Sequence, residues 1–291
     1  MGVGAPVPAL HGPPPPPGAR FVDDPEELIE HYSDRPDAHV YALVDLGEPY
    51  WSASRWYRRD DAVVGVIGLP GGEGLAVYAV ATVDPHGTLD LVAELAPALP
   101  SGLLVTGPVG LGDRLARVRP VAWHGPHERY VLATTELATT ELAGPDAESS
   151  DDEWTVEPLV RADLARLDEL YSRSPGAVFF LPSMLDDGAF VGVHRRGDPV
   201  RRLVAAAGTH VLSDRHGVAA LGAVFTDPTM RGLGLGRRAT IGAIHRVLDP
   251  GRPRPITTVG LNVAADNTIA RRLYESLRFD AVHTYAEAEL A

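Results

Sequence analysis

The glycine-rich segment at residues 231–236 has a pattern that could bind phosphate. It reads Arg-Gly-Leu-Gly-Leu-Gly, between a run with strand character at 218–226 and a run with helix character at 237–248. A turn that leaves a strand and opens a helix directs several backbone N–H groups at one point, with the positive end of the helix dipole behind them. Glycines let the backbone approach phosphate oxygens closely, and neighbouring arginines add charge-assisted contacts. The segment therefore predicts a site for a phosphorylated ligand.

The spacing of the glycines separates the classes of phosphate ligand. A dinucleotide site needs Gly-x-Gly-x-x-Gly early in a βαβ unit, and a P-loop needs Gly-Lys followed by Ser or Thr. The chain fits neither pattern, and it contains no lysine, because all 26 of its basic residues are arginines. It has Arg-x-x-Gly-x-Gly instead, followed further along by Asn-Thr-Ile-Ala-Arg-Arg-Leu-Tyr-Glu-Ser-Leu-Arg-Phe at residues 267–279.

These two motifs, in this order, resemble the acetyl-coenzyme A site of the GNAT superfamily of N-acetyltransferases. The resemblance is specific over residues 205–280 and extends at the level of the fold over the rest of the C-terminal half. It implies an α/β (α+β) fold, with a mixed, mostly antiparallel sheet flanked by helices. It also implies direct transfer of an acetyl group from acetyl-CoA, as cosubstrate, to an amine. That reaction requires the pyrophosphate to be anchored, the thioester carbonyl polarised, the ammonium deprotonated and the thiolate protonated.

The resemblance also implies roles for individual residues. The strand before the turn would splay from the strand carrying Asn262, so that its free backbone groups could pair with the pantetheine arm. Asn267 would cap the next helix and contact the same arm, and Tyr274, two turns along that helix, would protonate the coenzyme sulfur. The alternatives are a simple cap for the asparagine and a core packing role for the tyrosine. The implied coenzyme contacts are Val224, Phe225, Thr226, Arg231, Gly232, Leu233, Gly234, Leu235, Gly236, Arg237, Asn262 and Asn267.

The general base is left open by the sequence. His210 lies on the strand before the coenzyme strand, and His283 and Tyr285 alternate on the last strand. Histidine titrates in the useful range, so we take His210 as the first candidate, although a structural role is the alternative for each residue alone. Several GNAT enzymes are thought to use a chain of waters instead. Where the family commonly has Leu-Gly-Phe, this chain has Arg278, which must adopt a positive φ or end the helix differently.

Composition narrows the classes of function. The chain has 291 residues, no cysteine and a net charge of -13, which excludes thiolate metal clusters and cysteine acyl-enzymes and argues against wide nucleic-acid contact. The histidines show no metal-ligand spacing, and no apolar run approaches the roughly 18 residues of a membrane span. We expect a cytoplasmic enzyme without a metal, acting on a small-molecule or peptide amine. A homodimer is left open.

The chain is long enough for two domains. We expect a disordered proline-rich lead at 1–19, a degenerate GNAT-like domain at 20–144, an acidic linker at 145–154 and the acetyltransferase domain at 155–291. The N-terminal half is predicted to begin with a helix at 25–32, strands at 40–44, 50–57, 62–67 and 74–82, and a helix at 89–95. Its strand-to-helix turn lacks Arg-x-x-Gly-x-Gly, so a coenzyme site there would be lost.

Two rival functions remain. A non-catalytic acyl-CoA-binding or sensing protein would bind the coenzyme without turnover, and retention of Tyr274 argues against it. A tRNA-dependent aminoacyl transferase built from two GNAT-like domains would lack an intact coenzyme turn and require a basic surface.

Overall fold

The chain forms two compact units that interleave in sequence. A computed structural model describes residues 12–69, 74–132, 153–174, 176 and 178–291. Unit 1 comprises Met1–Arg129, Val263–Thr268 and Ala281–Ala291, and unit 2 comprises Tyr130–Asn262 and Ile269–Asp280. The C-terminal strand therefore groups with the N-terminal part of the chain. The predicted linker at 145–154, apart from its last two residues, and the repeated Thr-Thr-Glu-Leu-Ala of residues 134–143 lie outside the described residues.

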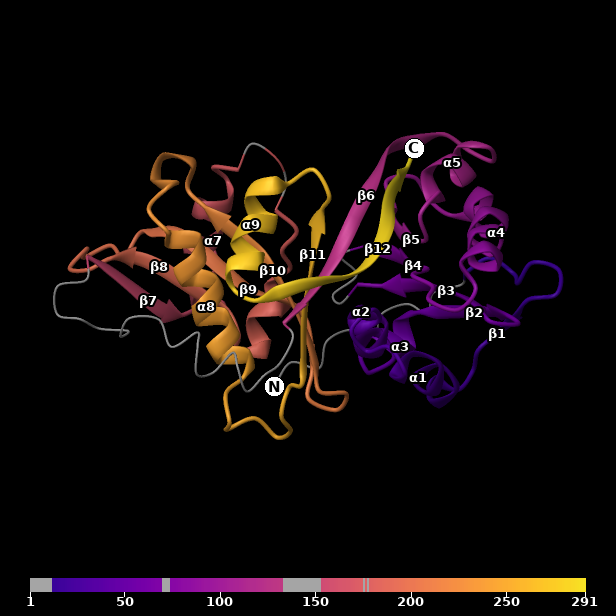
Figure 1. The fold of residues 1–291 in the computed structure, drawn as a ribbon, viewed down its shortest axis with the longest axis horizontal. Helices are drawn as coiled ribbons and strands as arrows, with labels where there is room; N and C mark the ends of the chain where they lie inside the picture. The colour runs from indigo at the N-terminus through magenta and orange to yellow at the C-terminus, as the bar shows by residue number, and fades with distance from the viewer. Residues whose placement is uncertain (1–11, 70–73, 133–152, 175, 177) are drawn as a thin grey trace. The chain divides into compact units, whose positions relative to one another are not determined.

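Unit 1 is built on a mixed sheet (Figure 1). Its helices are α1 (Pro25–Ser33), α2 (Val40–Asp45), α3 (Tyr50–Ala53), α4 (Pro85–Leu95) and α5 (Leu111–Ala116). Its strands are β1 (Arg20–Phe21), β2 (Arg55–Arg59), β3 (Ala62–Gly68), β4 (Leu75–Tyr78), β5 (Leu104–Gly107) and most of β6 (Val121–Leu132) and β12 (Phe279–Leu290). The strand order is β1-β2-β3-β4-β5-β12-β6. The pairs β1/β2, β2/β3, β3/β4 and β5/β12 are antiparallel, and β4/β5 is parallel.

The strands of unit 2 pair in the order β11-β10-β9-β8-β7. Its strands are β7 (Trp154–Pro158), β8 (Val191–Arg195), β9 (Leu203–Ser213), β10 (Val218–Thr226) and most of β11 (Thr258–Ala264). Its helices are α7 (Leu164–Tyr171), α8 (Leu235–Val247) and most of α9 (Thr268–Ser276), with 3₁₀ turns η3 (Arg161–Asp163), η4 (Pro182–Asp187) and η5 (Pro228–Met230). All pairs are antiparallel except β10/β11, which is parallel.

The two units repeat one topological motif. In unit 1, the antiparallel strands β2, β3 and β4 are followed by α4 and by β5 parallel to β4. In unit 2, the antiparallel strands β8, β9 and β10 are followed by α8 and by β11 parallel to β10. A parallel pair requires a crossover connection, and a helix supplies it in both units. The strands and crossover helix of unit 1 therefore follow the same order as those of unit 2.

Each unit has its own hydrophobic core. In unit 1, α4 and α5 cover one face of the sheet, and buried residues such as Leu91, Leu95 and Leu111 pack with Val77 and Val105 of the strands. In unit 2, the core joins α7, η4 and the strands through a cluster of leucine and phenylalanine side chains. That cluster includes Leu167, Leu170, Leu185, Phe190, Leu203 and Phe225. These cores fix the strand ends on which any site must be built.

One predicted strand is wrong, and so is the first part of another. Residues 40–44 form helix α2, and residues 50–53, the first part of the second predicted strand, form the short helix α3. A short buried apolar run has no clear periodicity of its own, so its neighbours decide between strand and helix. All but one of the six residues of α2 are buried, including the carboxyl residue Asp45, which obscures the helical period.

Two further expectations about local structure have clear outcomes. Arg278 has a φ of 67°, so it adopts the left-handed conformation that glycine normally supplies after a helix. Residues 12–18, which belong to the predicted disordered lead, lie against β2: Tyr57 donates to the Pro13 carbonyl over 2.8 Å and Arg59 to the Pro17 carbonyl over 3.4 Å. No helix within the described ranges has the length and apolar character needed to cross a membrane.

Candidate functional site

The turn from β10 into α8 leaves the helix N-terminus open. Gly234 is the N-cap of α8, with a φ of 74° and no side-chain cap. Gly232 has a φ of 81°, and open space surrounds the position that a Cβ would take at either glycine. At Gly236, by contrast, a Cβ would lie 2.9 Å from the Thr226 hydroxyl oxygen. The first N–H groups of α8 thus have no capping side chain and point out of an exposed turn, as an anion site requires.

Two cations stand beside this open helix end. Arg231 and Arg237 are both exposed. Neither side chain has an ion pair or a hydrogen bond to the rest of the described chain. A long, unpaired guanidinium is free to reach an oxyanion and to form charge-assisted hydrogen bonds with it.

The loop before the turn is anchored by Asp227. Its carboxylate accepts hydrogen bonds from the Thr229 N–H over 2.9 Å and the Thr229 hydroxyl over 2.7 Å. It also pairs with Arg173 at 2.6 Å. The hydrogen bond from Thr229, above all, lowers the pKa of Asp227, and Arg173 adds to the effect. Because these contacts hold the Asp227 carboxylate in place, they also fix the position of the loop that leads into the glycine turn.

The strands β10 and β11 separate before β10 ends. Their ladder runs from Val218↔Thr258 to Leu221↔Leu261. β10 nevertheless continues to pair with β9 as far as Thr226↔Ala205. The segment 222–226 therefore has neighbours on the β9 side but no ladder with β11, so its backbone can pair with an extended ligand arm.

A bulge marks the point of separation. The register of β10 against β9 shifts between Gly222 and Phe225, and Ala223 has a φ of 52°. Tyr171 donates to the Ala223 carbonyl over 2.9 Å, and the Ala223 N–H donates to Nε2 of His210 over 3.1 Å. A positive φ at alanine costs about 1–2 kcal/mol, and these two hydrogen bonds help to offset that strain.

The His210 side chain packs against this bulge and hydrogen-bonds to it. A Cβ at Gly222 would lie 2.2 Å from its ring, so the ring covers that glycine. Its ring also stands edge-on to Phe179, with 5.3 Å between the centroids. Burial lowers the pKa of His210 to about 4, against a raising effect of a hydrogen bond with the Phe179 backbone. The ring is therefore neutral near pH 7, and its Nε2 lone pair already accepts the Ala223 N–H.

Tyr274 has an uncommitted hydroxyl. The residue is 7% exposed on α9, and its ring lies 6.1 Å from that of Phe279. Burial raises the pKa of Tyr274 to about 12, so the phenol keeps its proton at neutral pH. Within the described part of the chain the hydroxyl has no hydrogen-bond partner, yet it is not among the sealed polar atoms. The Tyr274 hydroxyl is therefore accessible and can donate a proton.

The remaining predicted residues fall in both units. Val224, Phe225 and Thr226 close β10, and Leu233 and Leu235 belong to the turn and the first position of α8. Asn262 lies on β11 in unit 2, directly after the end of the β10 ladder. Asn267 groups with unit 1 and donates its backbone N–H to the Ala264 carbonyl over 2.9 Å, just before α9. His283 and Tyr285, the alternative bases, also lie in unit 1, where Tyr285 donates to Glu287 over 3.1 Å.

The sequence did not point to Tyr171, Arg173 or Asp227. Tyr171 acts on a backbone carbonyl 52 positions away, and Arg173 on a side chain 54 positions away. No local motif signals such contacts, because they depend only on how α7 packs against β10. The described residues hold no group of three metal-binding side chains.

The corresponding turn in unit 1 is closed. The Asp84 side chain caps α4 by accepting from the Gly87 N–H over 2.9 Å, so a carboxylate stands where an anion would bind. β4 and β5 also stay paired to the end of β4, since the Ala79 N–H donates to the Thr106 carbonyl over 2.8 Å beyond Tyr78↔Thr106. At this turn the described part of unit 1 therefore has neither the open helix end nor the separated strands found in unit 2.

The family is decided by a comparison with protein-family models. The model described as the acetyltransferase (GNAT) family matches residues 146–279. Residues 146–279 are a GNAT-family acetyltransferase domain. This GNAT domain contains the glycine turn, the bulged strand and Tyr274. The activity of the family is acyl transfer from an acyl-CoA.

Solved structures extend the likeness of fold beyond the GNAT domain. A Drosophila protein is 14% identical, with a TM-score of 0.65, covering 94% of this chain and 98% of its own. A GCN5-related N-acetyltransferase-like protein from Streptococcus suis is 14% identical, with a TM-score of 0.57 and coverage of 92% and 99%. A tandem GNAT protein from the clavulanic acid biosynthesis pathway is 13% identical, with a TM-score of 0.51 and coverage of 93% and 97%. At these identities the likeness concerns the fold alone. Curated protein sequences yield no match.

Proposed function

We propose that the GNAT domain at residues 146–279 is an N-acetyltransferase that moves an acetyl group from acetyl-CoA directly to an amine. The pyrophosphate would bind the N-terminus of α8, with Arg231 and Arg237 as its charged partners, and Asn262 and Asn267 would contact the pantetheine arm. The acceptor would be a small-molecule or peptide amine, for which the net charge of -13 gives a favourable field. We also propose a cytoplasmic location, from the composition of the chain.

One observation carries the proposal: the ladder between β10 and β11 ends at Leu221, five residues before β10 itself ends at Thr226 and the chain turns towards α8. An adenine nucleotide alone needs only the phosphate-binding turn. A strand edge with free backbone groups directly before that turn suits a ligand in which an amide-containing arm continues from the pyrophosphate. Coenzyme A has this construction, and unit 1, with a capped helix and closed strands, offers no equivalent.

Tyr274 is our proposed general acid. A phenol with a pKa near 12 holds a proton for the departing thiolate and does not lose it to solvent at pH 7. For His210 the geometry favours positioning rather than the predicted role as general base. Its lone pair holds Ala223, and that contact would be lost if the ring took a proton from the acceptor amine.

The experiment is a calorimetric titration of the full chain with acetyl-CoA. Gly234→Glu should abolish binding, since it introduces a carboxylate at the mouth of the helix N-terminus. Gly197→Glu is the matched control, because Gly197 has a φ of 77° with open space around it, and Gly234 a φ of 74° with the same open space. Both variants carry the same backbone strain and charge, so only the location differs. Equal binding by both variants, or no binding by the wild-type chain, contradicts the proposed site.

A second candidate function is acyl-CoA sensing without turnover. Release of free thiol from acetyl-CoA in the presence of a panel of amines separates the two, since a sensor binds the coenzyme and releases none. The free hydroxyl of Tyr274 favours the transferase, because simple binding does not require a proton donor.

A further inference from the structure

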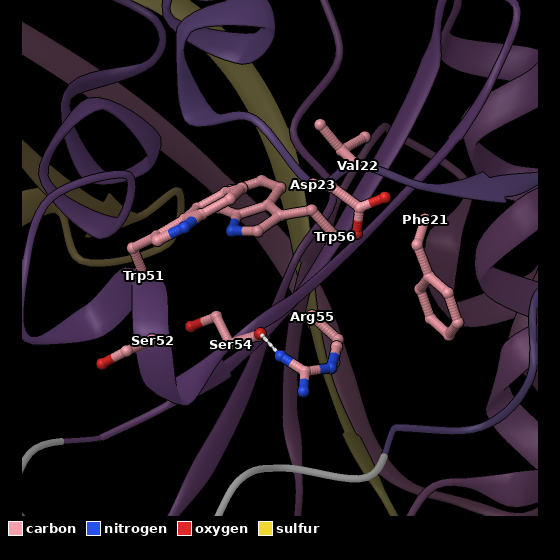
Figure 2. A pocket seen from close by; sticks show the side chains of 8 residues that line it. All are labelled: Phe21, Val22, Asp23, Trp51, Ser52, Ser54, Arg55 and Trp56. Atoms are coloured by element: carbon pink, nitrogen blue, oxygen red, sulfur yellow. Dashed lines mark hydrogen bonds between the residues drawn. The ribbon is translucent and has the colours of Figure 1, made fainter.

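Unit 1 contains a surface pocket with two opposite charges. The pocket has a volume of about 270 Å³ and is lined by residues from the β1–α1 connection, from α3 and from the start of β2 (Figure 2). Its charged members are Asp23 and Arg55, and its aromatic members are Phe21, Trp51 and Trp56. It lies on a different unit from the GNAT glycine turn and has no part in the proposed transfer reaction.

Within the described residues, neither of these two charged side chains forms an ion pair. In Figure 2 the dashed line from Arg55 leads to the Ser54 carbonyl, at 2.9 Å, and not to Asp23. Neither Arg55 nor Asp23 has an ion pair, and Asp23 has no hydrogen bond, in the described ranges. Arg20, Arg35, Arg58 and Arg59 of the same unit, by contrast, pair with carboxylates.

The other polar residues of the lining indicate which pocket residues would bind an ammonium and which would bind a carboxylate. The Ser52 hydroxyl donates to Glu48 over 2.7 Å, and the Ser54 hydroxyl to the Tyr50 carbonyl over 2.7 Å. With their protons used, these hydroxyls have lone pairs left and act as acceptors. An ammonium needs acceptors and a negative charge, and the pocket lining includes the serine oxygens and the Asp23 carboxylate. A carboxylate needs donors, and Arg55 supplies them.

The back wall of the pocket is rigid. Trp56 is 2% exposed, and a Cβ at Gly65 would lie 2.8 Å from its ring, so the indole lies flat against that glycine. It also packs near Tyr32 and Tyr78, with centroids 6.2 and 6.4 Å away. The indole N–H of Trp56 is sealed and has no partner among the described residues. Aromatic walls with few rotamers provide contact area at low entropic cost.

From these groups we infer that the pocket of unit 1 binds a small zwitterion that carries one ammonium and one carboxylate, as a free amino acid does. Arg55 binds the carboxylate, and Asp23 binds the ammonium. The volume is below the roughly 300–1,000 Å³ of sites for drug-sized ligands, so the ligand is smaller than these. A ligand with both charges neutralises both unpaired side chains, whereas an ion of either sign leaves one of them unpaired.

The test is calorimetry of the full chain with glycine, L-serine and L-phenylalanine, which span no side chain, a small polar one and an aromatic one. Phenethylamine and 3-phenylpropanoate serve as probes that keep the ring but carry one charge each. We expect saturable binding of at least one amino acid below about 10 mM and at least tenfold weaker binding of both single-charge probes. Absence of binding by all three amino acids overturns the inference, as does equal binding of either single-charge probe.

Variants then locate the site. Arg55→Gln and Asp23→Asn should each weaken binding about tenfold or more, whereas Arg117→Gln, an exposed arginine on the same unit without a partner in the described chain, should not. Circular dichroism checks that each variant folds. Unchanged affinity in the folded Arg55 and Asp23 variants places the ligand elsewhere and overturns the assignment.

Discussion

The backbone N–H of Ala223 donates a hydrogen bond of 3.1 Å to Nε2 of His210. This contact joins the residue predicted as the general base to the residue that bends β10 away from its regular ladder. Together with the hydrogen bond from Tyr171 to the Ala223 carbonyl, it holds both backbone groups of one strained residue. The bulge precedes the segment that would receive the coenzyme arm, so its geometry bears directly on coenzyme binding.

Removal of the Tyr171 hydroxyl should weaken coenzyme binding. In Tyr171→Phe the Ala223 carbonyl loses its partner, at a cost of about 1–3 kcal/mol for a buried group, and the bulge can relax. We expect the KM for acetyl-CoA to rise about tenfold, with a smaller change in kcat. Steady-state kinetics and calorimetry measure this. A fall in kcat alone would place Tyr171 in the chemical step.

The role of His210 can be separated by a pH profile. We expect His210→Gln to raise the KM for acetyl-CoA and to leave the acid limb of the kcat profile in place. The reason is that burial already lowers the pKa of His210 to about 4, so the ring does not titrate near neutral pH. Disappearance of the acid limb, with a loss of kcat of about 10²-fold or more, would instead restore the histidine as general base.

Tyr274→Phe should lower kcat while acetyl-CoA still binds. The hydroxyl has no partner to lose in the described chain, so the free energy of unfolding should change little. A proton donor contributes about 10²–10⁴-fold to a rate, and we expect a loss of kcat of about 10²-fold. Calorimetry with acetyl-CoA serves as the control. Full activity of the variant would show that solvent protonates the thiolate.

The contribution of Arg231 and Arg237 to acetyl-CoA binding should depend on the salt concentration. Arg231→Gln and Arg237→Gln should each raise the Kd for acetyl-CoA about tenfold at low ionic strength, because an exposed charge-assisted contact is lost. The difference from the wild-type chain should shrink at 1 M salt, where the Debye length falls to about 3 Å. Arg117→Gln on unit 1 is the control and should leave the Kd unchanged at every salt concentration.

Substitution of Asp45 should stabilise the folded protein. It is buried on α2 with no cationic partner among the described residues, and burial raises the pKa of its carboxyl well above the usual range. The folded state therefore holds this proton above pH 4 while the unfolded state releases it, so stability declines as the pH rises from 4 towards the folded pKa. Asp45→Asn should raise the free energy of unfolding at pH 7 by about 1 kcal/mol or more.

Urea denaturation at several pH values measures this difference. It should vanish below pH 4, where the carboxyl is protonated in both states. The exposed Asp61 of the same unit, 61% accessible and 3.8 Å from Arg58, provides the control, because an exposed pair contributes little. A destabilised Asp45→Asn variant at pH 7 would mean that the carboxylate form is the one that the fold stabilises.

Local patterns determined much of the GNAT domain. The bounds of β10 and the conformations of the glycines at 232 and 234 follow from strand periodicity and from the left-handed φ that only glycine adopts freely. The positive φ at Arg278 is one of the two outcomes that its place after a helix left open. The strand bounds and the glycine conformations depend on neighbours in the sequence, so the sequence is enough to predict them.

Tertiary structure decided the rest, because the groups concerned are distant in the chain. The role of His210 depends on a bulge 13 positions away, and that of Tyr171 on a carbonyl 52 positions away. The last strand pairs with β5 of unit 1, although sequence order assigns it to the GNAT domain, since strands pair by the edge they meet. Residues 40–44 form a helix that the sequence did not reveal, because burial of nearly every residue removes the periodicity that distinguishes strand from helix.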